Sequence, residues 1–366
     1  MKTSSSRGAV SRRQVLGGMA ATATVAGLPR RVRAQGSRHV KLSLPWVAEG
    51  SSLFSFVAKH QGYWAKHGLD VEILRGSGSV AAAQAVATGQ FDFSFPAASA
   101  SILQVLKGLP MVCIGACAYD ATQGVAVLAD SPIKTPKDLE GHKMGAVVSS
   151  GEYPFLPAFA ERAHFDLKKV DIQQVDVQIR ERLLADKQVD AISGFGTSII
   201  PALASKGVET RMMLYSKYGI PNYGNTLVTR PEVLKKDAAL CEAIVDGAMQ
   251  AIKFCLLNPK KASDIFFKEV PEMAMSPSAH DQIRIGLGLI NRVVLADTAK
   301  EKGLGFMDPA TMKEMTELTI QYVVKDAKMP AVDALYTNQF VGKIKLTDAE
   351  WQQAMSATSD FAKYLS

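Results

Sequence analysis

Hydrophobic positions follow two different periods between residues 39 and 214, and the two periods alternate along the chain. Short runs of apolar and β-branched residues predict strands at 40–46, 69–74, 91–96, 142–148, 170–175 and 189–195. Apolar residues at helical spacing predict helices between them, at 51–68, 79–89, 97–108, 151–165, 178–187 and 196–207. Strands that alternate with helices are typical of βαβ units, so the predicted fold class is α/β with mainly parallel sheets.

The second half of this stretch repeats the first. Residues 89–99 (GQFDFSFPAAS) parallel residues 187–198 (KQVDAISGFGTS), and the pairing aligns Gln90 with Gln188 and Asp92 with Asp190. The order of six elements is also shared. The sequence therefore predicts two versions of one α/β lobe.

The pattern becomes helical from about residue 230 to the end of the chain. Strand-like residues at 124–130 and 225–230 flank the second lobe, and we expect the chain to cross between the lobes there. The predicted division is one lobe from residues 39–122 plus 223–366 and a second lobe from residues 123–222.

The net charge of +7 comes from the N-terminal segment alone. Residues 1–35 contain seven Lys and Arg and no Asp or Glu, so the remainder has a net charge of zero. The basic balance therefore gives no reason to expect a nucleic-acid partner for the folded body. Arg12 and Arg13 precede a modest apolar run at 15–28 and small or apolar residues at 32–34. This pattern predicts a twin-arginine signal peptide over residues 1–35 and a periplasmic mature protein, with a basic tail as the alternative.

The four cysteines suggest neither disulfides nor a metal site. Cys113 and Cys117 lie in one predicted strand, where four residues span about 13 Å, beyond the reach of a disulfide. Cys241 and Cys255 complete the set, and no C-x-x-C spacing or His/Cys cluster is present. We expect buried free thiols and no metal or cofactor.

Three strings then carry a resemblance: GYWAKHGLDVEI (62–73), SGSVAAAQAVATGQFDFSF (77–95) and KTPKDLEGHKMGA (134–146). The chain resembles the type II periplasmic solute-binding proteins of ABC importers, in the group that serves nitrate, sulphonates, taurine and the pyrimidine precursor of thiamine. The resemblance implies a two-lobed fold with crossovers near 119–125 and 218–225. It implies a monomeric receptor, not an enzyme, that passes a small sulphonate-, taurine- or pyrimidine-like solute to a membrane permease. Two alternatives stay open, a pyrimidine-precursor synthase-like enzyme of the same fold and a receptor for a sensor kinase.

In such a fold the ligand lies outside the carboxyl ends of the strands, where helices begin and their N–H groups favour acceptors. The turns at these positions are rich in small residues and hydroxyls. The predicted ligand-binding residues are Trp46, Ser77, Ala98, Ser99, Ser149, Ser150, Gly151, Glu152, Tyr153, Phe195, Gly196, Thr197 and Tyr223.

Ser149 and Ser150 admit three roles. A nucleophile would need a pattern such as G-x-S-x-G, and the sequence has V-S-S-G-E instead. Helix capping alone is possible, with Ser150 as the cap. The resemblance favours capping combined with ligand contact. Glu152, in the same turn, would then accept hydrogen bonds from an amine or amide and repel a sulphonate or nitrate.

Overall fold

The computed structural model describes residues 37–365. The predicted signal peptide lies outside this range, so its export role stays a prediction. Within the described range, no helix is both long enough and apolar enough to cross a membrane. All four cysteines are buried free thiols, as the sequence predicts.

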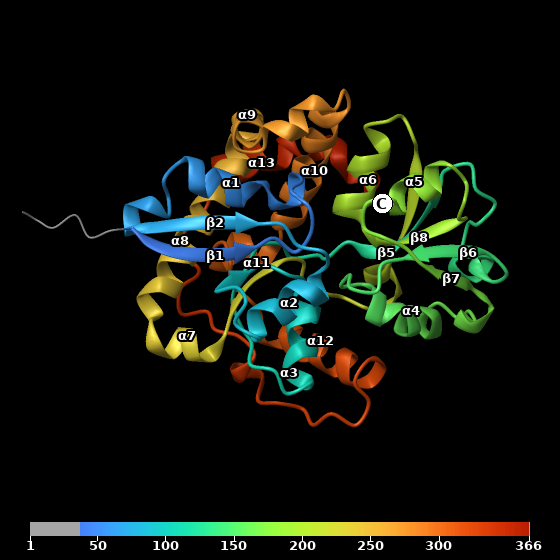
Figure 1. Ribbon diagram of the computed structural model, residues 1–366, viewed down its shortest axis with the longest axis horizontal. Coiled ribbons are helices and arrows are strands. Elements are labelled where there is room, and N and C mark those ends of the chain that lie inside the picture. The colour runs from blue at the N-terminus through green and yellow to red at the C-terminus, as the bar shows by residue number, and fades with distance from the viewer. Residues whose placement is uncertain (1–36, 366) are drawn as a thin grey trace, which may run out of the picture. The chain divides into compact units, whose positions relative to one another are not determined.

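The chain forms two five-stranded sheets that lie side by side, one on the left and one on the right of Figure 1. The first sheet has the order β2-β1-β3-β10-β4 and the second has the order β7-β6-β8-β5-β9. Strands of the first sheet are β1 (Arg38–Ser43), β2 (Leu69–Leu74), β3 (Phe93–Ser94), β4 (Val112–Ala116) and β10 (Thr226–Thr229). Strands of the second sheet are β5 (Gln123–Leu128), β6 (Lys143–Ala146), β7 (Asp171–Gln174), β8 (Ala191–Phe195) and β9 (Thr210–Leu214).

The two sheets have the same topology. In each, three neighbouring strands are parallel, and the fourth strand in the order (β10 or β5) is antiparallel to both of its neighbours. Four of the five strands therefore share one direction, which confirms the α/β class with mainly parallel sheets. The antiparallel strand is in both cases the first strand after the chain has crossed from the other sheet.

The repeat seen in the sequence has a structural counterpart. Asp92 Oδ2 accepts a hydrogen bond from the amide of Lys41, and Asp190 Oδ2 accepts one from the amide of Lys143, both at 2.9 Å. The two lysines lie one residue before the point where β1 pairs with β3 and β6 pairs with β8. The aspartates thus extend the strand pairing by one bond in each sheet.

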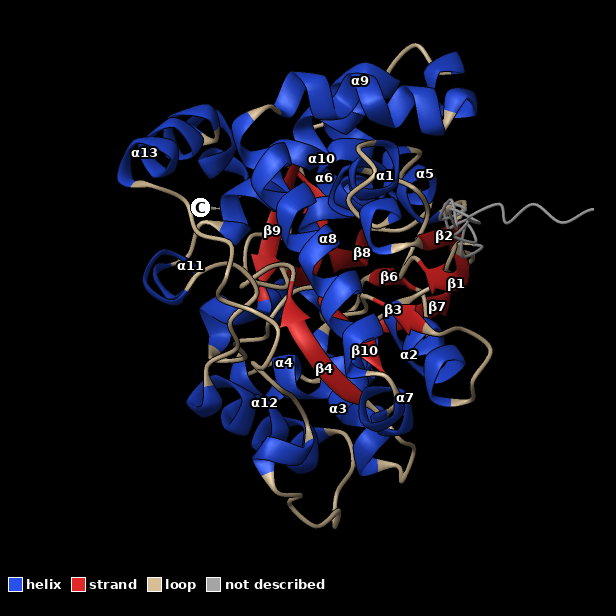
Figure 2. Cartoon of the chain, turned by 90° about the vertical axis from the view of Figure 1, so that its left-hand side faces the viewer, coloured by secondary structure: helices blue, strands red, loops and turns tan. Residues whose placement is uncertain are grey.

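Helices cover both faces of each sheet (Figure 2). The helices are α1 (Leu53–His60), α2 (Ser79–Ala87), α3 (Ala98–Leu106), α4 (Leu156–Arg162), α5 (Arg180–Ala185), α6 (Gly196–Ala204), α7 (Pro231–Lys236), α8 (Ala238–Leu257), α9 (Pro259–Glu269), α10 (Ala279–Val294), α11 (Asp297–Lys302), α12 (Pro309–Tyr322) and α13 (Asp348–Ala357). We call the first sheet with α1, α2, α3 and α8 the first lobe, and the second sheet with α4, α5 and α6 the second lobe.

Two predicted helices are shorter than the sequence pattern suggests. The helix predicted over 51–68 ends at His60, and Gly62 then adopts a left-handed φ of +69°. The helix predicted over 151–165 begins as a 3₁₀ turn, η4 (Tyr153–Phe155), before α4. Pro154 and Pro157 explain this start, because a proline lacks the amide hydrogen that an interior helical position would use.

Two C-terminal helices pack on both lobes. Helix α10 places Ile283 and Leu287 in the core of the first lobe, and Ile285 and Leu289 in a core that includes α6. Helix α12 likewise contributes methionines to the core beside α2 and α3, and Leu318 to the core beside α4. The C-terminal third therefore holds the lobes together, in addition to the chain crossovers.

The chain crosses between the sheets twice, at 117–122 and at 215–225, and the two crossovers lie side by side. Ala121 N donates to Asn222 O (2.9 Å) and Gly224 N donates to Ala118 O (3.1 Å). Thr122 has a φ of +50°, which is unusual for a β-branched residue.

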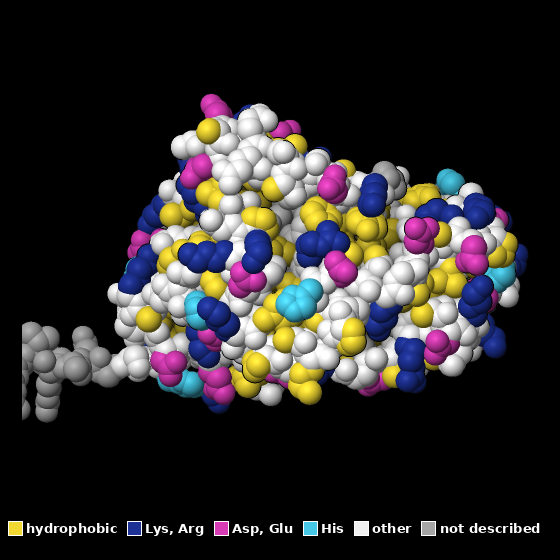
Figure 3. All heavy atoms as spheres, turned by 90° about the horizontal axis from the view of Figure 1, so that it is seen from above, with side chains coloured by type: hydrophobic (Ala, Val, Ile, Leu, Met, Phe, Trp, Pro, Cys, Tyr) yellow, Lys and Arg dark blue, Asp and Glu magenta, His cyan; other side chains and the backbone are white. Residues whose placement is uncertain are grey.

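Acidic and basic side chains are interspersed over the face seen in Figure 3.

Candidate functional site

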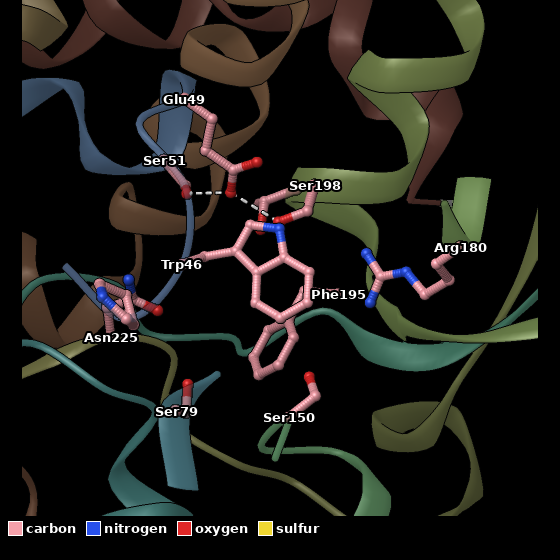
Figure 4. A pocket seen from close by; sticks show the side chains of 11 residues that line it. Trp46, Glu49, Ser51, Ser79, Ser150, Arg180, Phe195, Ser198 and Asn225 are labelled. Carbon is pink, nitrogen blue, oxygen red and sulfur yellow. Dashed lines mark hydrogen bonds between the residues drawn. The ribbon is translucent and has the colours of Figure 1, made fainter. Parts of the chain in front are cut away.

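A small cavity lies between the two lobes and is lined by residues from both (Figure 4). Its volume is about 20 Å³, which is enough for one ordered water. The first lobe and its crossover contribute Trp46, Glu49, Ser51, Ser79 and Asn225. The second lobe contributes Ser150, Arg180, Phe195, Thr197 and Ser198. The side chains of both lobes are therefore already in contact across this space.

The turn after β1 supplies the first lobe's carboxylate. Glu49 lies six residues after the end of β1 and is 6% exposed. Its Oε1 accepts hydrogen bonds from Ser51 Oγ (2.7 Å) and from Ser198 Oγ (2.6 Å), which belongs to the second lobe. Burial raises the pKa of Glu49 to about 7, although both serine bonds lower it. Glu49 thus joins the lobes through a carboxyl group that titrates near neutral pH.

The corresponding turn after β6 supplies a second buried carboxylate. Glu152 lies six residues after the end of β6 and is 0% exposed. It accepts hydrogen bonds from Ser150 Oγ and from Ser193 Oγ (3.0 Å), both of the second lobe. Burial raises the pKa of Glu152, and the nearby positive charge of Arg180 opposes that rise. Ser150 lines the cavity and Glu152 lies behind it, so Glu152 acts on the cavity through Ser150.

Arg180, the first residue of α5, is the cation of this region and is 1% exposed. Three of its five N–H groups are bonded within the second lobe, because Nε (3.0 Å) and Nη2 donate to Glu181 and Nη1 donates to Ser193 O (3.3 Å). It meets the first lobe at Trp46, with the guanidinium carbon over the indole ring and 4.9 Å from its centre. Desolvation lowers the pKa of Arg180, but the carboxylates of Glu181 and Glu152 raise it by more, so the group stays charged.

The lobes also meet through main-chain groups. Ser149 Oγ donates to Ser77 O (2.6 Å). Gly78 adopts a φ of +134°, and a Cβ at this position would lie 2.2 Å from the carbonyl oxygen of Ser149. Only glycine allows this approach, because any side chain at residue 78 would collide with the opposite lobe.

Several amides at the helix starts around the cavity are bonded within the protein. The bonds are Val80 N to Ser149 O (3.1 Å), Ala98 N to Gly224 O (3.1 Å) and Gly196 N to Thr122 O (2.8 Å). The sequence prediction that free N–H groups would face the ligand therefore does not apply to these three amides. The polar groups that line the cavity are mainly serine hydroxyls and the Glu49 carboxylate.

The structure brings most of the predicted site residues to this region. Trp46, Ser150, Phe195 and Thr197 line the cavity. Ser77 and Ser149 form the contact between the lobes, and the buried residues Ala98, Ser99, Gly151, Glu152 and Gly196 lie in the elements that carry the lining.

Two predicted residues have other partners. Tyr153 packs against the core of the second lobe. The Tyr223 hydroxyl accepts a hydrogen bond from Asp308 N (2.9 Å), and its ring contacts the ring of Tyr119. Neither is among the residues that line the cavity.

The sequence prediction omitted the two ionisable residues that line the cavity, Glu49 and Arg180. Glu49 had an available signal, since it occupies in the first turn the place that Glu152 occupies in the second. Arg180 had none, because an adjacent Arg-Glu pair on a helix normally indicates an exposed ion pair. Ser51, Ser79, Ser198 and Asn225 were also omitted.

These features define a two-lobed α/β protein with a site between its lobes, and comparisons with known proteins agree with that class. A family model described as "NMT1/THI5 like" matches residues 51–262. The match covers more than half of the chain, so the chain belongs to this family.

Curated relatives are 22–25% identical to the chain over the aligned residues. A protein described as "Putative thiamine biosynthesis protein" from Haemophilus influenzae is 25% identical over 69% of this chain and 80% of its own length. A formylaminopyrimidine-binding protein from Halalkalibacterium halodurans is 22% identical, over 64% of this chain and 71% of its own length.

Among solved structures, the periplasmic nitrate-binding protein of Synechocystis PCC 6803 superposes with a TM-score of 0.63 at 13% identity. The superposition covers 90% of this chain and 91% of that protein. The chain therefore has the periplasmic-binding-protein fold.

Proposed function

We propose that this protein is the exported solute receptor of an ABC importer. It is secreted by the twin-arginine route, acts as a monomer in the periplasm, captures a small organic solute between its lobes and presents the closed form to a membrane permease. It has no catalytic role of its own. Residues 39–122 with 223–366 form one lobe in this proposal, and residues 123–222 form the other.

The observation that carries the proposal is the contact between the lobes at the cavity. Glu49, Ser77 and Trp46 of the first lobe meet Ser198, Ser149 and Arg180 of the second. Each of these contacts is lost when the lobes separate. A solute that binds both sides of the cavity therefore favours the closed form, which is the differential affinity that a closing receptor needs.

The charges around the cavity support a solute that donates hydrogen bonds. The carboxylates of Glu49, Glu152 and Glu181 outnumber the single guanidinium of Arg180, whose three nitrogens each already donate a hydrogen bond within the second lobe. Three helix-start amides that would otherwise suit an anion are bonded within the protein. A flat amine- or amide-bearing solute of pyrimidine type suits this site better than a sulphonate, taurine or nitrate, and one relative is described as binding such a pyrimidine.

Thermal unfolding with a panel of solutes tests the proposal. The mature protein, freed of any co-purified molecule, is mixed with formylaminopyrimidine, cytosine, taurine, an alkanesulphonate or nitrate. A ligand at one hundred times its Kd stabilises the folded state by about 2.7 kcal/mol, so binding gives a clear rise in Tm. We expect that rise with a pyrimidine and not with nitrate or the sulphonate.

Two variants make the test specific. Glu49→Gln should reduce the Tm rise with the pyrimidine, because its carboxylate accepts from the solute in this proposal. Glu272→Gln, at an exposed position far along the chain, should leave the rise unchanged. A rise with sulphonate or nitrate alone would contradict the proposed solute class, and no rise with any member would contradict the receptor itself.

A further inference from the structure

Trp46 occupies the centre of the space between the lobes. Figure 4 shows its indole ring between Arg180, Ser198 and the ring of Phe195, all of the second lobe. Its main chain is held by hydrogen bonds within the first lobe, since Trp46 O accepts from Gly76 N (3.0 Å) and Pro45 O accepts from Gly78 N (2.9 Å). The ring thus projects from a fixed backbone of one lobe into the other lobe.

The contact between Trp46 and Arg180 is of a specific kind. A guanidinium over an indole ring is a cation–π interaction, and it strengthens when water is excluded from both groups. Arg180 is 1% exposed, and its three bonds to Glu181 and Ser193 hold the guanidinium in place. A group that enters the cavity would meet this guanidinium where the indole now lies against it.

The remaining space is too small for an organic solute. The cavity of about 20 Å³ holds one water, whereas pockets for small organic molecules are typically of several hundred Å³. A solute that binds while these lobes stay closed must therefore displace a side chain that is present there. Trp46 is the largest side chain that lines the cavity.

We infer that Trp46 is an intramolecular latch, seated on Arg180 in the place that the solute takes. The solute exchanges with the indole beside the guanidinium, and Trp46 turns away as it binds. This inference rests on the proposed receptor function. A latched receptor binds more weakly than an open one, because its competent form is only a fraction of the molecules.

The direction in which a substitution of Trp46 changes the affinity for the solute distinguishes a latch from a residue that only lines the site. If Trp46 competes with the solute, Trp46→Leu should raise both the association rate and the affinity for formylaminopyrimidine, by about tenfold, the equivalent of about 1.4 kcal/mol. If Trp46 only lines the site, the same change should weaken binding. Arg180→Lys keeps the charge but loses the flat face, so it should weaken binding in either case.

Fluorescence gives a second readout. Of the three tryptophans, Trp64 and Trp351 are 1% and 7% exposed and lie elsewhere in the first lobe's core. Release of Trp46 from Arg180 should change the emission when formylaminopyrimidine binds. Trp46→Phe should abolish that change, and Trp351→Phe, the matched control, should keep it.

A solute-independent arm uses free indole. In Trp46→Gly the space of the side chain is open, and indole added to this variant should raise its Tm and compete with formylaminopyrimidine. Indole should not raise the Tm of the wild-type protein, because the Trp46 side chain already fills this space.

The outcomes distinguish this inference from the proposed function. Tighter binding by Trp46→Leu, together with competition by indole in Trp46→Gly, supports the latch. Binding by wild type that weakens in Trp46→Leu overturns the latch and leaves the receptor function standing. Absence of binding by wild type and by both Trp46 variants overturns both.

Discussion

Glu49 and Glu152 lie in corresponding turns of the two lobes, and comparison of the two shows how one repeated element can take two roles. Each glutamate follows the first parallel strand of its lobe by six residues, and each accepts hydrogen bonds from two serines. Both serines of Glu152 belong to its own lobe. One of the serines of Glu49 is Ser198, from the opposite lobe.

The difference is one of partner and not of local structure. Glu152 is enclosed by its own lobe and supports Ser150 and Arg180, whereas Glu49 lines the cavity and bonds across it. We therefore expect changes at Glu152 to affect mainly stability, and changes at Glu49 or the facing turns to affect closure and its pH dependence.

The largest expected effect is at Glu152. Glu152→Ala leaves the hydroxyls of Ser150 and Ser193 without their acceptor, removes a countercharge of Arg180 and opens a cavity. We expect a loss of about 4 kcal/mol in the free energy of unfolding. Denaturant unfolding measures it, and Glu49→Ala, the corresponding change in the first lobe, should cost about 1 kcal/mol. Equal losses in the two variants would mean that the glutamates have equivalent roles.

The contact of Gly78 with Ser149 gives the next effect. Gly78→Ala places a methyl group against the opposite lobe, so the closed form becomes inaccessible and the affinity for the solute should fall about a hundredfold, or about 2.7 kcal/mol. Gly108→Ala is the control, because Gly108 also has a positive φ (+82°) but no atom within 4 Å of the added Cβ. Calorimetric titration should show the loss only at residue 78. A similar loss in the control would attribute it to backbone strain.

The raised pKa of Glu49 predicts a pH dependence. Between the ordinary carboxyl pKa and the folded value of about 7, the folded protein keeps a proton that the unfolded chain has released. The free energy of unfolding should therefore fall as pH rises from about 5 to about 7, by about 2 kcal/mol, and level off above. Thermal unfolding across this range measures the slope.

Two variants assign this slope. Glu49→Gln should flatten it, and Glu272→Gln should not. The pKa of Glu152 is also raised by burial and contributes a slope of the same sign, which should remain in both variants. An unchanged slope in Glu49→Gln would contradict the assignment to Glu49.

The smallest effect tests the repeat itself. Asp92→Ala and Asp190→Ala each remove one hydrogen bond to a strand amide, and each should cost about 1 kcal/mol. Asp190→Ala also removes an exposed contact with His142 Nδ1 (3.2 Å), which adds little because such surface pairs are weak. The costs should agree within about 0.5 kcal/mol and add in the double variant, because the two sites share no partner. Urea unfolding of the three variants would show non-additivity if the lobes were coupled through these strand ends.

Much of the fold could be predicted because its signals are local. The periods of apolar residues predicted the strands and helices. The alignment of the segment around Asp92 with the segment around Asp190 predicted a repeat, and in the structure each aspartate accepts a 2.9 Å hydrogen bond from a strand amide of its own sheet. The turns around the site could also be found, since small residues and serines follow the strand ends. The family resemblance rests on the same local strings, and the family model matches residues 51–262.

The tertiary structure alone decided which side chains meet. Ser198 is 149 residues from Glu49, and Arg180 reaches Trp46 from a helix of the other lobe, so neither pairing leaves a trace in the sequence around it. Burial of an Arg-Glu pair depends on what packs over it and not on its neighbours along the chain. Periodicity and turn chemistry are local, so the residue pattern predicted the α/β elements and the turns that face the cavity. The raised pKa of Glu49 and the position of the Trp46 side chain arise only where the turns of the two lobes meet, because both depend on the removal of water by residues that are distant in the chain.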